Sequence, residues 1–97
     1  MEEITKHLIR HERFDCENEY YELKHTLYNL SEERKCLKDV LTEFFNVYDS
    51  LENKSKLKET RNYLLSEWHF YKVQFKIVES SLKSIKKSLK DFDKILN

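Results

Sequence analysis

Large side chains recur at alternating third and fourth positions along two long stretches of the chain. Ten of eleven positions in the first series and eleven of twelve in the second are apolar or aromatic. This spacing places a continuous seam along one side of a helix and is typical of helices that pack as coiled coils. The first series is Cys16, Tyr20, Leu23, Leu27, Leu30, Arg34, Leu37, Leu41, Phe44, Tyr48 and Leu51, and the second is Leu57, Arg61, Leu64, Trp68, Tyr71, Phe75, Val78, Leu82, Ile85, Leu89, Phe92 and Leu96.

The two series are out of phase, because six residues separate Leu51 from Leu57 where the pattern requires seven. Coiled coils absorb insertions of three or four residues, whereas the loss of one residue rotates the seam by about 100°. We therefore predict an all-α fold, an antiparallel helical hairpin of coiled-coil type in a single domain over residues 1–97. Helix one is expected over residues 3–52, the turn over 52–56 and helix two over 56–96. Asn53 would close the first helix, Ser55 would cap the second, and Tyr48 would lie beside Arg61.

A second possible break lies at Ser31, which is followed by Glu32 and Glu33. A hydroxyl followed by two carboxylates is a favourable helix start. A break there would give a three-helix bundle. The seam continues through this region without a change of phase, so the hairpin is the favoured prediction.

The apolar surface exceeds what a single hairpin can bury. Additional apolar side chains lie beside both seams, and others lie in an N-terminal segment that is expected to overhang the end of helix two. Small two-helix folds bury too little surface to be stable alone, so we predict that two hairpins dimerise into a four-helix bundle. The expected partner-binding residues are Ile4, Leu8, Val40, Val47, Tyr63, Phe70 and Ile77.

Composition agrees with long helices, because the chain contains neither Gly nor Pro, the usual residues of tight turns. The net charge is zero, yet residues 1–52 carry a net charge of −6 and residues 53–97 carry +6. Opposite halves of equal magnitude suit antiparallel pairing of one half on the other, or a head-to-tail dimer.

No residue cluster carries recognisable catalytic or metal chemistry. The spacing of His7, His11 and Asp15 puts them on one helical face, but without a third ligand fixed by the fold this pattern predicts a solvated face rather than a zinc site. Cys16 and Cys36 are expected to be buried free thiols. We therefore expect no enzyme activity, no metal, no cofactor and no small-molecule substrate.

One concentrated basic face occurs near the C-terminus, and it is formed by Lys83, Lys86, Lys87, Lys90 and Lys94. Such a stripe could bind nucleic acid or an anionic membrane surface. Asp91 and Asp93 interrupt it, and the aromatic residues are expected on the opposite, packed side, so nucleic acid is not the expected partner. The favoured interpretation is a solvated face, or one that forms ion pairs with the acidic first helix.

Arg34 and Arg61 occupy seam positions. Each either sets the register of the packed helices or extends past the seam to a carboxylate. The leading functional hypothesis is a non-catalytic protein–protein interaction module that acts through coiled-coil packing, with a homodimer or another helical protein as its partner. The first alternative is a small inhibitor or antitoxin-type protein that masks a basic site on its target. The second is a protein that binds nucleic acid or a membrane surface through Lys83–Lys94. No signal peptide or membrane-spanning segment is predicted, so a cytoplasmic or nuclear location is expected.

Overall fold

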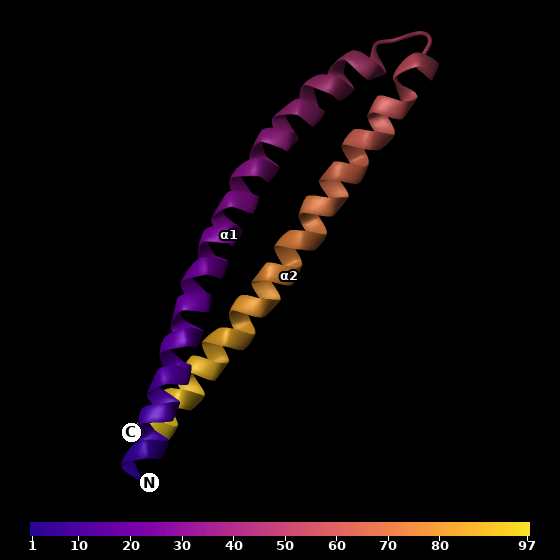
Figure 1. Cartoon of the computed structure of the whole chain (residues 1–97). Coiled ribbons are helices and arrows are strands. Elements are labelled where there is room, and N and C mark those ends of the chain that lie inside the picture. Colours follow the sequence, from indigo (N-terminus) through magenta and orange to yellow (C-terminus); the bar gives the residue numbers. More distant parts are fainter. The chain divides into compact units, whose positions relative to one another are not determined.

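The computed structural model describes all 97 residues as two long helices that pack as an antiparallel hairpin without strands (Figure 1). Helix α1 spans Glu3–Asp49, a short 3-10 helix η1 spans Ser55–Leu57, and helix α2 spans Lys58–Leu96. The predicted fold class is therefore confirmed. Because α1 continues unbroken through Ser31, the alternative of a three-helix bundle is wrong. The uninterrupted seam, including Leu30 and Arg34, outweighs the local start signal at Ser31.

The predicted seam is confirmed along both helices. None of its twenty-three residues is exposed, whereas most residues between them are. Leu41 on α1 and Val78 on α2 are the two buried members, and the others are half-buried.

The turn differs from the prediction in its details. Helix α1 ends at Asp49, three residues earlier than expected, since both the backbone N–H and the hydroxyl of Ser50 donate to the Val47 carbonyl, at 3.2 and 2.7 Å. These local bonds compete with helix continuation. Neither predicted cap forms as expected. Ser55 does not cap a helix; instead its N–H and hydroxyl donate to the Asn53 side-chain oxygen, at 3.1 and 2.7 Å.

The chain divides into two compact units, and each is described by itself. Unit 1 combines Met1–Leu27 with Ile77–Asn97, and unit 2 comprises Tyr28–Lys76. In each unit a segment of α1 packs against a segment of α2. In unit 2 the predicted neighbours Tyr48 and Arg61 do lie together, with the guanidinium carbon 6.0 Å from the ring centroid.

The core is thin. Leu41 and Val78 retain 9% and 8% of their accessible surface, and no large side chain is fully buried. Two helices can enclose a seam on two sides only, so every seam residue keeps an edge in solvent. Neither helix contains a stretch apolar enough to cross a membrane.

Candidate interaction surfaces

Each helix has two flanks beside its seam. Residues directly before a seam residue lie on one flank, and residues directly after a seam residue lie on the other, since successive residues are separated by about 100°. Towards the N-terminus the same spacing continues from Cys16 to Arg13, Ile9 and Lys6, which are half-buried and extend the seam of α1. In an antiparallel pair, the "before" flanks of both helices lie on the same face of the hairpin. The "after" flanks share the opposite face. The chemistry of these two faces differs in both units.

In unit 2 the "before" face is apolar and acidic. Val40 and Val47 from α1, with Tyr63 and Phe70 from α2, are 50–63% exposed on this face. The charged residues of this face in α1 and α2 are Glu33, Glu43 and Glu67, and the one cation, Lys56, lies in η1 beside the turn. We call this surface the acidic face of unit 2. Four of the predicted partner-binding residues therefore lie together.

In unit 1 the "before" face has the same sign of charge. Its charged residues are all acidic: Glu12, Asp15, Glu19, Glu22 and Asp91. Ile77 and Leu8, two further predicted contact residues, lie on this face and are exposed, as is Ile95. Ile4, the remaining one, is exposed on α1 before the first seam turn. We call this surface the acidic face of unit 1.

The "after" face of unit 1 is basic and aromatic. Lys24, Lys83 and Lys86 line a groove, together with one acid, Glu79. The floor of the groove is formed by the seam residues Tyr20, Leu27 and Leu82. This groove shows that the "after" flanks of the two helices meet on one face. Arg10 and Lys90 belong to the same face by their positions. The expectation that the lysines lie away from all aromatic residues is therefore wrong. We call this surface the basic face of unit 1.

In unit 2 the "after" face is also basic. A second groove is lined by Ser31, Lys35 and Lys38 beside the seam residues Arg34 and Trp68. Lys58, Lys72 and Lys76 follow seam residues of η1 and α2 on the same face, whose two acids, Asp49 and Glu52, lie beside the turn. Each unit is thus acidic on one face and basic on the other.

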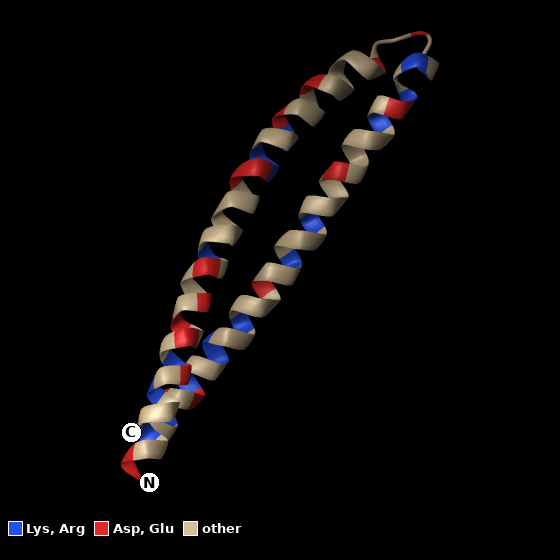
Figure 2. Ribbon diagram, viewed as in Figure 1, with Lys and Arg blue, Asp and Glu red and all other residues tan.

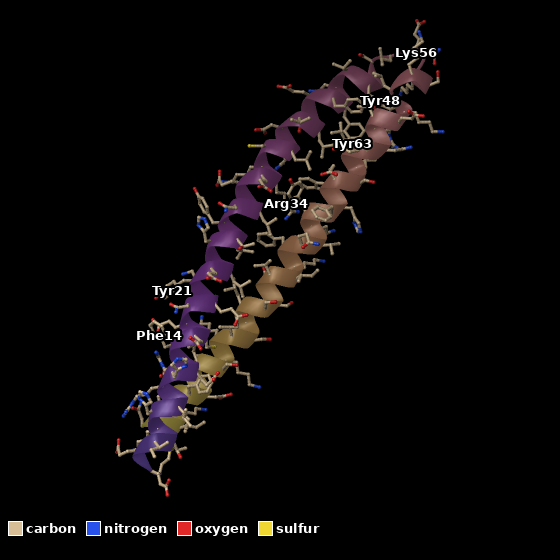
Figure 3. All side chains as sticks on the ribbon, in the orientation of Figure 1. Phe14, Tyr21, Arg34, Tyr48, Lys56 and Tyr63 are labelled. Carbon is tan, nitrogen blue, oxygen red and sulfur yellow. The ribbon has the colours of Figure 1, made fainter.

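Three exposed aromatic residues were missed by the sequence analysis. Phe14, Tyr21 and Tyr28 are spaced seven residues apart on α1, each directly after a seam residue, and are 60–63% exposed. Figure 3 shows Phe14 and Tyr21 projecting from the side of α1 that points away from α2. The seven-residue spacing was visible in the sequence and is the same signal that identified Tyr63, Phe70 and Ile77.

The ion pairs do not follow the charge asymmetry of the two halves. The single ion pair between the helices joins Arg13 of α1 to Asp93 of α2 at 2.6 Å, with the cation on the acidic half. Arg13 also contacts Glu17 at 2.8 Å. These two carboxylates, Asp93 foremost, raise the pKa of Arg13. Figure 2 shows the lysines in blue along the C-terminal part of α2. No lysine of the Lys83–Lys94 stripe forms an ion pair and all five are exposed, so the ion-paired interpretation is wrong and the solvated one holds. The physical reason is that the acidic and basic stripes lie on opposite faces.

The two seam arginines pack on aromatic rings rather than on carboxylates. The guanidinium carbon of Arg34 lies 4.7 Å from the Trp68 ring centroid and 6.0 Å from that of Phe75 (Figure 3). Arg61 lies 6.0 Å from the rings of Phe45 and Tyr48. In such cation–π contacts the negative face of the aromatic ring attracts and stabilises the cation. The carboxylate alternative is therefore wrong, and the register-setting role stays a prediction.

Two further polar residues of the seam, Cys16 and Tyr71, have raised pKa values. The Sγ of Cys16 lies 3.9 Å from the Ile85 carbonyl oxygen, and burial is the main cause that raises the pKa of this thiol. Cys16 is half-buried and Cys36 is exposed, so the expectation of two buried thiols is wrong for Cys36 and holds only in part for Cys16. It directly precedes the seam residue Leu37, which places it on the acidic face of unit 2. The Glu33 carboxylate raises the pKa of Tyr71 on the other helix of unit 2.

The histidine pattern near the N-terminus forms one local contact. His11 Nδ1 lies 3.4 Å from Asp15 Oδ2. No group of three or more potential ligands is close enough to hold a metal ion.

No protein-family model, curated protein or solved structure matches the chain.

Proposed function

We propose that this chain is a non-catalytic assembly module that joins copies of itself through coiled-coil-type helix packing. The proposal is supported by one observation: the hairpin buries very few apolar side chains, whereas many others, several of them spaced seven residues apart, are exposed to solvent. Two residues are buried, whereas fourteen large apolar residues are exposed. Burying such surface is the main driving force for association of helices in water.

The acidic face of unit 2 is the strongest candidate for the contact. Scattered exposed apolar residues are normal on any protein, but continuous apolar rows indicate interaction sites. Val40 with Val47, and Tyr63 with Phe70, form two such rows, one from each helix. A second helical surface laid against these rows would extend the two-helix seam into a bundle.

Substitution of these rows tests the proposal. Full burial of a Val or Phe side chain contributes about 1.5–3 kcal/mol, so the double variant V47S/F70S should weaken self-association by at least about tenfold. The measurement is sedimentation equilibrium over a range of micromolar concentrations. The wild-type mass should rise above that of one 12.0 kDa chain as the concentration increases.

The control is V73S, because Val73 is partly exposed on α2 but lies on neither face. It should associate as the wild type does. A fully helical wild-type chain that remains a monomer at every concentration would exclude the proposed function.

A further inference from the structure

The acidic and basic stripes of unit 1 have matching spacing, and neither forms an ion pair with a Lys, Arg, Asp or Glu of the chain. On α1 the acids Glu12, Asp15 and Glu19 are separated by three and then four residues, and on α2 the lysines Lys83, Lys86 and Lys90 are separated in the same way. At 1.5 Å per residue each set of three spans about 10 Å. Asp15 contacts only His11, and the other five form no ion pair.

The uncharged residues of the two faces also complement each other. On the acidic face of unit 1, the α2 positions between Ile77 and Asp91 are the small residues Ser81, Ser84 and Ser88. On the basic face, α1 presents the exposed rings of Phe14 and Tyr21. If α1 of one copy lies over α2 of another, acids meet lysines, and the small residues of α2 meet the aromatic rings of α1.

Pairing of identical faces is less favourable. Two acidic faces of unit 1 would place five carboxylates of one copy against five of the other, without a Lys or Arg on either. Juxtaposed like charges oppose association. On the basic face, two of the three acids, Glu17 and Asp93, are already held by Arg13, which leaves its lysines as the dominant free charge.

We propose that the acidic face of unit 1 binds the basic face of unit 1 in a second copy of this chain, with α1 of one copy over α2 of the next. This inference rests on the proposed function and specifies which faces meet. Because the two faces lie on opposite sides of one unit, the contact is heterologous. Each copy keeps one acidic and one basic face free for the next, so assembly continues beyond the dimer or closes into a ring.

Matched charge reversals test this arrangement. The variant K83E/K90E reverses the lysine stripe, and E12K/E19K reverses the acidic stripe. The control is K87E/K94E, which makes the same change of charge at the same seven-residue spacing on the same helix, but on neither face. All six positions are exposed, so the hairpin should tolerate each substitution, which far-ultraviolet circular dichroism verifies.

Sedimentation equilibrium at low salt should show that K83E/K90E and E12K/E19K each associate at least about tenfold more weakly than the wild type. K87E/K94E should associate within about twofold of the wild type. An equimolar mixture of the two impaired variants should associate again, because each supplies the face that the other has reversed.

The possible failures are distinguishable. If K83E/K90E keeps the wild-type mass, the basic face of unit 1 takes no part in the contact, and the inference is overturned while the proposed function stands. Equal weakening of K83E/K90E and K87E/K94E would overturn it as well, because net charge rather than a defined face would then control association. A helical wild-type chain that is monomeric and gains mass only with duplex DNA would overturn both proposals.

Discussion

The contact between Arg34 and Trp68 offers the sharpest test of the packing in unit 2. Arg34 occupies a half-buried seam position, and its guanidinium carbon lies 4.7 Å from the indole centroid. Cation–π pairs contribute about 0.5–1 kcal/mol when exposed and about 2 kcal/mol when desolvated. A half-buried pair should therefore contribute about 1 kcal/mol.

A double-mutant cycle isolates this contribution from the other effects of each substitution. The variants are R34A, W68L and the double variant R34A/W68L, unfolded with urea and followed by circular dichroism at one fixed protein concentration. We expect R34A to lower the free energy of unfolding by about 1–2 kcal/mol, since the aliphatic part of the side chain also loses packing. The coupling energy between the two positions should be about 1 kcal/mol.

The control cycle combines R61A with W68L, because Arg61 packs on Phe45 and Tyr48 and forms no cation–π contact with the indole. The coupling energy between positions 61 and 68 should be close to zero. Trp68 is the single tryptophan, so its fluorescence provides a second readout, and R34A should move the emission to longer wavelength. If the coupling energy between Arg34 and Trp68 equals that of the control cycle, and the Trp68 emission is unchanged in R34A, the proposed packing of Arg34 on the indole is refuted.

Two further predictions concern the two cysteines and the seam residue Tyr71. Cys36 should react with a thiol reagent at least about tenfold faster than Cys16, because Cys36 is exposed whereas burial raises the pKa of Cys16 and lowers its thiolate fraction. The C36S and C16S variants assign the two rates, and equal rates would contradict the partial burial of Cys16. The substitution E33Q should lower the pKa of Tyr71 towards the ordinary tyrosine value, measured by ultraviolet titration with Y71F as the reference, and an unchanged pKa would exclude Glu33 as the main cause. Since the folded-state pKa is raised, any stabilisation from this tyrosine is present below its ordinary pKa and is lost as the pH rises through the raised value.

The sequence predicts the hairpin because its periodicity reports burial directly. A seam residue is apolar since it faces the other helix, and the one-residue loss of phase between Leu51 and Leu57 requires a reversal. The ends of the turn were predicted less well. Ser50 and Asn53 can form several local hydrogen bonds of similar strength, and which of them forms depends on the three-dimensional path of the turn.

The faces were harder to predict than the seam. Counting charges by halves suggested that α1 and α2 neutralise each other, but the sign of a half does not determine on which flank each charge lies. Assigning each charge to the position before or after a seam residue separates the acids from the lysines, and the sequence contains this information. The aromatic partners of Arg34 could not be predicted in this way, because the contact with Trp68 depends on the relative stagger of two helices.

Sedimentation equilibrium of the wild-type chain at low and high salt tests most directly whether a second copy completes this hairpin. We predict a mass above that of one 12.0 kDa chain at low salt, which increases with concentration and falls as salt screens the two charged faces. A mass of one chain at every concentration and in both salts, with the helices intact, would contradict the proposal.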